Sequence, residues 1–266
     1  MTVKIALFDI DGTLVPHGSS LVPPGTVQAL ARLRQAGITV AVASGRIWPQ
    51  IQPFIKALAF DDYVCANGHI VTDGQGSILA DHPIPEPLIK ELAAYCRRHG
   101  YPIGVKFSDD ITIFASYRQA MESIFHNMVV TDMANLLVDG TNDLAKLDRR
   151  PSYNALVAIP DGQLTAVAAQ LPRIRFDRIR ANLYNAGLPD FTKADGITLL
   201  LQRLGLNWDE TIIFGDAEND IVMLDKAGIA VAMGDGQPAA QKAADYVTGP
   251  CSGDGIADAL THFHLI

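Results

Sequence analysis

The amino-acid sequence predicts an α/β protein with a parallel-sheet core and an α+β domain inserted into the middle of the chain. Two observations lead to this fold class: buried-strand and helical patterns alternate near both ends, and these patterns change in between. With 266 residues, of which 48% are apolar, the chain is long enough for two domains with separate cores. The same apolar content excludes an intrinsically disordered chain.

The strands of the core are predicted from short apolar runs that are rich in β-branched residues. Such uninterrupted runs are typical of strands covered on both faces of a sheet. Helical stripes lie between them and end at a glycine. This order of strand, helix and strand predicts a Rossmann-like parallel sheet. The expected strands are residues 3–8, 38–43, 63–66, 211–214 and 228–232, and the expected helices are residues 27–35 and 195–204.

The middle of the chain lacks long apolar runs, and its elements are more mixed. Prolines at 82–87 and a Gly/Pro stretch at 185–190 mark its flanks. We therefore expect a core formed by residues 1–82 and 187–266, and an inserted α+β domain formed by residues 83–186. Its expected strands are residues 103–107, 111–114 and 154–159, and its expected helices are residues 88–98, 119–127 and 164–171.

Charge and hydropathy exclude several kinds of partner. The chain has 21 Lys and Arg against 29 Asp and Glu, so its net charge of -8 creates no overall positive field for nucleic acid or an anionic membrane. No apolar run approaches the roughly 20 residues of a membrane-spanning helix, and the N-terminus does not fit a signal peptide. The 3 cysteines have neither CxxC nor zinc spacing and are expected to be buried thiols. These features predict a cytoplasmic protein. We also expect a monomer or a small homo-oligomer, although these features do not select between the two.

Asp9 and Asp11 stand at the end of the first expected strand, in the run DIDGT. In an open α/β sheet the carboxyl ends of the strands carry the ligand sites. Two carboxylates this close repel one another unless a cation or a proton separates them, and Gly12 allows the chain to turn directly after them. The alternative is an acidic turn without chemistry.

A second motif, Ser44-Gly45-Arg46, follows the strand at 38–43. A hydroxyl, a glycine amide and a helix beginning near Ile47 would together form a phosphate-binding site. An ordinary loop with a solvated arginine explains the same residues.

Two further signals lie near the end of the chain. Lys193 precedes the helix at 195–204, although a lone lysine is by default a surface residue. Asp216 ends the strand at 211–214, and Asn219 and Asp220 follow at the start of an expected helix at 220–227. Helix capping explains Asn219 or Asp220, but Asp216 comes too early in the sequence to serve as a cap.

In this order, the motifs resemble those of the haloacid dehalogenase superfamily of aspartate-nucleophile phosphatases. More narrowly, the chain is similar to the bacterial sugar-phosphatase-like branch with a large type II α/β cap between the second and third motifs. The matching stretches are FDIDGT (8–13), ASGR (43–46), ANGHIV (66–71), Lys193 with ADGI, FGDAENDIVML (214–224), AGIAVAMG (227–234), ADYVT (244–248) and GDGI (253–256).

This resemblance implies a role for each motif. Asp9 would be the nucleophile that becomes an aspartyl phosphate, and Asp11 the general acid and base. Mg²⁺ would be held by the Asp9 and Asp216 carboxylates and the Asp11 backbone carbonyl, with Asp220 in support. Ser44 and Lys193 would hold the phosphoryl oxygens. Gly45, Arg46 and Asn219 would contact substrate or phosphate.

The implied activity is Mg²⁺-dependent hydrolysis of small phosphomonoesters such as sugar phosphates. A phosphosugar mutase or phosphotransferase of the same superfamily would share these motifs, because the inserted cap selects the acceptor. A non-catalytic phospho-acceptor switch would also combine aspartates, a hydroxyl and a lysine. A module that binds sugar phosphates without turnover is a further alternative.

The arginines of residues 173–180 invite one more functional interpretation, a polyanion-binding edge. We favour an edge strand whose charges discourage aggregation. The histidines show no metal-ligand spacing.

Overall fold

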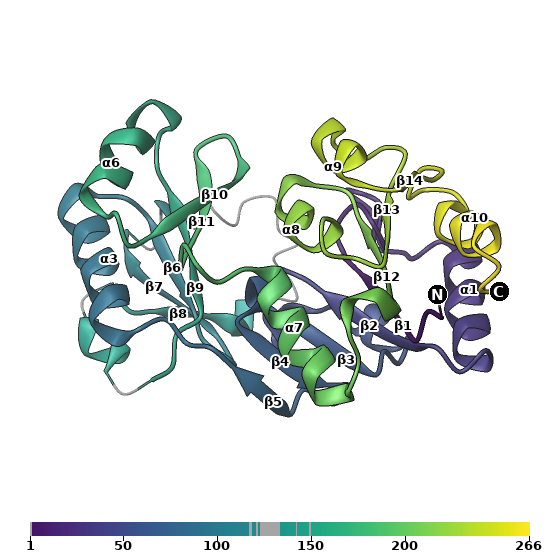
Figure 1. Cartoon of the computed structure of the whole chain (residues 1–266). Helices are drawn as coiled ribbons and strands as arrows, with labels where there is room; N and C mark the ends of the chain where they lie inside the picture. The colour runs from purple at the N-terminus through teal and green to yellow at the C-terminus, as the bar shows by residue number, and fades with distance from the viewer. Residues whose placement is uncertain (1, 117–118, 121, 123–133, 142, 149) are drawn as a thin grey trace. The chain divides into compact units, whose positions relative to one another are not determined.

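The computed structural model describes residues 2–116, 119–120, 122, 134–141, 143–148 and 150–266. The chain divides into two compact units (Figure 1). The core unit comprises Met1–Gly45, Pro53–Ala80 and Lys193–Ile266, and the cap unit comprises Arg46–Gln52 and Asp81–Thr192. In the part of the chain described, no helix is both long and apolar enough to cross a membrane.

The core unit is built on a sheet whose described strands follow the order β14-β13-β12-β1-β2-β3-β4-β5. Neighbouring strands from β14 to β3 are parallel, and β4 runs antiparallel to β3. The predicted parallel sheet is therefore confirmed. The strands are β1 (Ile5–Phe8), β2 (Thr39–Ala43), β3 (Asp62–Cys65), β4 (Ile70–Asp73), β5 (Ile78–Asp81), β12 (Thr211–Gly215), β13 (Ile229–Ala232) and β14 (Tyr246–Val247).

Both faces of this sheet are covered, which explains the apolar runs. Alternate side chains of β1 point to opposite faces of the sheet. Ile5 and Leu7 belong to the core cluster shared with α7, α8 and α9. Phe8 points to the other face and stacks on Phe214, with the ring centroids 4.9 Å apart. On the Phe8 side, α1 packs against β2 and α10. The helices are α1 (Pro24–Gln35), α2 (Pro53–Lys56), α7 (Lys193–Leu204), α8 (Ile221–Leu224), α9 (Pro238–Ala243) and α10 (Gly255–His262).

The cap unit has its own sheet, with the order β10-β11-β9-β6-β7-β8 among the described residues. Its pairs are antiparallel except for β7 and β8, and its hydrophobic core includes residues of α3 and α6. The strands are β6 (Ile103–Lys106), β7 (Ile111–Ala115), β8 (Leu137–Asp139), β9 (Asn154–Ala158), β10 (Arg175–Arg180) and β11 (Leu183–Gly187), and the helices are α3 (Glu86–His99) and α6 (Leu164–Gln170).

Three details refine the sequence-based expectations. The arginine-rich segment is the edge strand β10, with Arg175 paired to Asp177 and Arg178 to Asp161. The helix expected over 220–227 is shorter, because α8 covers only Ile221–Leu224. Most of the helix expected over 119–127 lies outside the described residues.

Candidate active site

Asp9 is placed by the register of the parallel sheet. It follows β1 directly, and its backbone N–H donates to Phe214 O of β12 at 3.1 Å. Because β1 and β12 are parallel neighbours, the residues after Phe8 and Gly215 lie at the same edge of the sheet. Asp9 is only 6% exposed and Asp216 only 3%, so both carboxylates have lost most of their contact with water.

Lys193 is the cation of this buried group. It is the first residue of α7, and its Nζ donates to Asp9 Oδ1 at 2.8 Å and to Asp220 Oδ1 at 2.6 Å. Burial alone would lower the pKa of Lys193, but the Asp220 and Asp9 carboxylates hold it above its ordinary value. Lys193 is therefore charged at neutral pH, and its default assignment as a surface lysine is wrong.

Asp220 orients the loop that carries Asp216. Its Oδ2 accepts from the backbone N–H groups of Asp216 at 3.0 Å and Ala217 at 3.2 Å, while its Oδ1 accepts from Lys193. Both carboxylate oxygens of Asp220 thus have protein donors. The Asp220 side chain also packs closely against Gly215, because a Cβ on Gly215 would lie only 2.7 Å from Asp220 Cβ.

The three buried carboxylates form a cluster suited to a divalent cation. One oxygen from each of Asp9, Asp216 and Asp220 lies within 4.8 Å of the others. Burial raises the pKa of Asp9 well above its ordinary value, against the opposing effect of Lys193. Burial, followed by the Asp220 charge, raises the pKa of Asp216 to about 6. A cation would favour the ionised carboxylates, and oxygen donors of this kind are the ligands that Mg²⁺ prefers.

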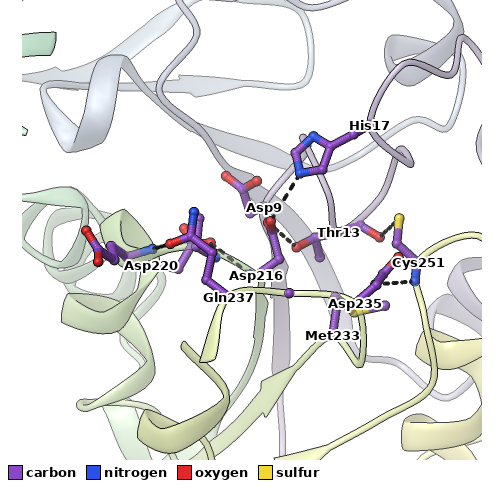
Figure 2. A network of polar contacts seen from close by, with 12 residues as sticks. Asp9, Thr13, His17, Asp216, Asp220, Met233, Asp235, Gln237 and Cys251 are labelled. Atoms are coloured by element: carbon purple, nitrogen blue, oxygen red, sulfur yellow. Dashed lines mark hydrogen bonds and ion pairs between the residues drawn. The ribbon is translucent and has the colours of Figure 1, made fainter. Parts of the chain in front are cut away.

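The turn after β1 contacts Asp216 directly (Figure 2). Thr13 Oγ1 donates to Asp216 Oδ1 at 3.1 Å, and His17 Nε2 lies 3.6 Å from Asp216 Oδ2. Gly12 has a φ of 93°, and a Cβ there would lie 2.3 Å from Asp216 Oδ2. These contacts were not predicted from the sequence. The signal for Gly12 and Thr13 was the run FDIDGT itself, in which they follow the two aspartates.

Two segments far along the chain complete the surroundings of Asp216 (Figure 2). The backbone N–H of Gln237 donates to Asp216 O at 2.7 Å, and Cys251 Sγ donates to Thr13 O at 3.0 Å. Asp235 Oδ1 in turn accepts from the backbone N–H of Cys251 at 2.9 Å. The Gln237 contact joins two backbone groups, so it leaves no residue-type pattern in the sequence. All three cysteines are free and buried, as expected.

Ser44 lies at the same edge of the sheet as Asp9, because β2 is the parallel neighbour of β1. It is 1% exposed, its N–H donates to Val64 O at 2.8 Å, and its C=O accepts from Asn67 N–H at 3.1 Å. Gly45 continues this loop, with the Asn67 carboxamide beside it. The structure thus places the predicted hydroxyl at the correct end of the neighbouring strand.

The other predicted site residues lie outside the buried cluster. Asp11 and Asn219 are exposed, with Asn219 on the 3₁₀ turn Glu218–Asp220. Arg46 belongs to the cap unit, where its Nη1 donates to Gln50 O at 3.1 Å.

The helix expected to begin near Ile47 is wrong. A 3₁₀ turn, Trp48–Gln50, follows Ile47, and the Ile47 N–H donates to Gln50 Oε1 at 3.0 Å. This N–H therefore already has a partner within the chain, and no α-helix N-terminus stands there to bind phosphate.

Comparison with known proteins assigns this arrangement to a family. Residues 6–260 match the haloacid dehalogenase-like hydrolases. The chain is 29% identical over the full length of both proteins to "Putative phosphatase YkrA" of Bacillus subtilis (strain 168), and 27% identical over the full length of both to the pyridoxal phosphate phosphatase YbhA of Escherichia coli (strain K12). A solved sugar phosphatase of haloacid dehalogenase subclass IIB is 27% identical, with a TM-score of 0.85 over 99% of this chain and 100% of that one.

The fold and the family together define the class of protein. The chain belongs to the haloacid dehalogenase-like hydrolases, as its motifs predicted. Within that family it is a phosphatase, an enzyme that hydrolyses phosphoric monoesters.

Proposed function

We propose that this enzyme hydrolyses small phosphorylated metabolites by transferring the phosphoryl group to Asp9, with Mg²⁺ as cofactor. The observation that carries the proposal is the buried Asp9 carboxylate, which lies next to the Lys193 ammonium and within reach of the Asp216 carboxylate. Lys193 opposes the effect of burial on the pKa of Asp9 and so favours the ionised, nucleophilic form.

The reaction proceeds in two steps. An Asp9 oxygen bonds to phosphorus, the bond from phosphorus to the ester oxygen breaks, and Asp11 donates a proton to the departing alkoxide. Asp11 then takes a proton from water, whose oxygen attacks phosphorus and releases phosphate and the Asp9 carboxylate. Lys193 and Ser44 bind phosphoryl oxygens, and Gly45, Arg46 and Asn219 supply further contacts to phosphate or substrate.

Mg²⁺ fits the residues at this edge of the sheet. Three buried carboxylates outnumber the one ammonium group that binds two of them, so a cation lowers the cost of their charges. Asp9, Asp216 and the Asp11 backbone carbonyl would hold it. Asp220, whose two oxygens already accept from Lys193 and from backbone N–H groups, would orient the site. Bound Mg²⁺ would supply positive charge for the transferring phosphoryl group.

We assign substrate selection to the inserted domain, residues 83–186, and catalysis to residues 1–82 and 187–266. On the cap sheet, Lys106 of β6 is paired in register with Asn154 of β9, on the face opposite the hydrophobic core of that unit. Both side chains are buried, and neither amide atom of Asn154 has a hydrogen-bond partner among the described residues. A carboxamide and a lysine on the same face of the sheet suit a hydroxyl-bearing phosphate such as a sugar phosphate. The free, buried cysteines fit a cytoplasmic location.

Phosphate release from a panel of sugar phosphates, pyridoxal phosphate and nucleotides tests the proposal. We expect turnover in Mg²⁺, silence after chelation with EDTA, and loss of at least about 10³-fold in kcat for Asp9→Asn with unchanged circular dichroism. Full activity in EDTA or in Asp9→Asn would refute it. Sugar-phosphate isomerisation without phosphate release would indicate a mutase, and an adduct stable for minutes would indicate a switch.

A further inference from the structure

The turn that follows β3 places three consecutive residues in the left-handed backbone region. The φ angles of Ala66, Asn67 and Gly68 are 51°, 55° and 101°. Only glycine adopts this region freely, because the Cβ of other residues approaches the following carbonyl oxygen. Strain of this kind persists only where surrounding contacts enforce it, and it gathers at functional sites.

One set of contacts joins this turn to the Ser44 loop. The Asn67 N–H donates to Ser44 O at 3.1 Å. The Asn67 carboxamide also packs against Gly45, where a Cβ would lie only 2.9 Å from Asn67 Oδ1. Oδ1 itself is buried and has no hydrogen-bond partner among the described residues. The backbone and the side chain of Asn67 therefore both define where the Ser44 loop can lie.

A second set of contacts joins the same turn to the start of α7. A Cβ on Gly196 would lie 2.3 Å from Gly68 O and 2.4 Å from Gly68 Cα, so the helix and the turn meet backbone to backbone. Gly196 lies about one helical turn after Lys193, the first residue of α7. Because a helix is a rigid element, a shift at Gly196 would displace the Lys193 ammonium.

We propose that residues 66–68 form a positioning element, which sets the spacing between the Ser44 loop and the N-terminus of α7. Asn67 acts through Ser44, and Gly68 acts with Gly196 through Lys193, so that the hydroxyl and the ammonium group meet the same phosphoryl group. The inference rests on the phosphate-binding roles proposed for Ser44 and Lys193. The turn itself touches neither substrate nor metal in this mechanism.

Gly196→Ala tests the contact with α7. We expect a 10- to 100-fold fall in kcat with p-nitrophenyl phosphate, and a similar loss of affinity for inorganic phosphate in Mg²⁺, because small misplacements of catalytic groups have effects of this size. Gly162→Ala is the matched control, since a Cβ there meets nothing within 4 Å. In a Lys193→Met background, Gly196→Ala should leave the phosphate affinity unchanged.

Asn67→Gly provides a second test that does not depend on the folding of Gly196→Ala. Glycine keeps the left-handed conformation and removes only the carboxamide. We expect kcat/KM to fall at least 10-fold relative to the wild-type enzyme. In the Ser44→Ala background, we expect Asn67→Gly to cause no further fall. Unchanged kinetics in both Gly196→Ala and Asn67→Gly would overturn the inference. So would independent effects, in which Gly196→Ala reduces activity as much in the Lys193→Met background, and Asn67→Gly as much in the Ser44→Ala background, as in the wild-type enzyme. Failure of the proposed function looks different, because the wild-type enzyme would then release no phosphate from any ester.

Discussion

Lys193 forms hydrogen bonds with two buried carboxylates at once, and this pairing determines how the site responds to substitution. Hydrogen bonds between charged groups are about twice as strong as neutral ones. Removing one partner leaves the other charge buried without compensation, which costs roughly 3–5 kcal/mol. Asp9, Lys193 and Asp220 therefore act as one unit, and a change at any of them affects the others.

Asp220→Asn should weaken Mg²⁺ binding while the protein stays folded. The amide oxygen can still accept from the backbone N–H groups of Asp216 and Ala217, but the NH₂ group that replaces Oδ1 cannot accept from Lys193. Loss of such a supporting residue typically lowers metal affinity by about 10- to 100-fold. The Mg²⁺ concentration for half-maximal activity measures the effect. Asp225→Asn, an exposed carboxylate just after α8, should leave that concentration unchanged, and an equal response of both variants would contradict the role of Asp220.

Stability without metal should fall as the pH rises from about 4 to about 6. Burial raises the pKa of Asp216 to about 6 in the folded protein, from an ordinary value of 3.8. In this window the folded state binds more protons than the unfolded state, so the free energy of unfolding decreases with pH. Urea unfolding in EDTA at a series of pH values measures this free energy. The decrease should be smaller in Asp216→Asn, and identical pH profiles for both proteins would show that Asp216 does not titrate in this way.

The core strands could be predicted from the sequence because both faces of the sheet are buried, so the residues of these strands form continuous apolar runs. The positions of Asp9 and Asp216 at the carboxyl ends of β1 and β12 could be predicted because each follows such a run. The 3₁₀ turn after Ile47 could not, since it depends on a hydrogen bond to the Gln50 side chain.

Gly12→Ala should reduce activity as well as stability, because it disturbs Asp216 in addition to straining the backbone. The substitution forces alanine into a φ of 93° and places its Cβ 2.3 Å from Asp216 Oδ2. Gly18→Ala is the matched control, with a φ of 77° and nothing within 4 Å of its Cβ. We expect Gly18→Ala to cost about 1 kcal/mol of stability with normal kinetics. Gly12→Ala should in addition lose Mg²⁺ affinity and at least about 10-fold in kcat. Matching kinetics in the two variants would show that the contact with Asp216 is unimportant.

At the scale of the whole molecule, the net charge of -8 does not determine the charge of the substrate. The Asp9, Asp216 and Asp220 carboxylates contribute to this acidity, but they are buried around Lys193. With the divalent cation that we propose, they would form a site that attracts a phosphate ester within an acidic protein. The net charge sums every ionisable group of the chain, whereas the proposed reaction depends on the local charges at one edge of the core sheet.

In the mechanism we propose, Asp9 carries the phosphoryl group during turnover. The most direct test is to quench the enzyme in acid while it hydrolyses a phosphate ester in Mg²⁺, and to locate the added phosphoryl mass by peptide mass spectrometry. We predict the adduct on Asp9 in the wild-type enzyme and its loss in Asp9→Asn. Continued turnover with no adduct, or an adduct on another residue, would contradict the account.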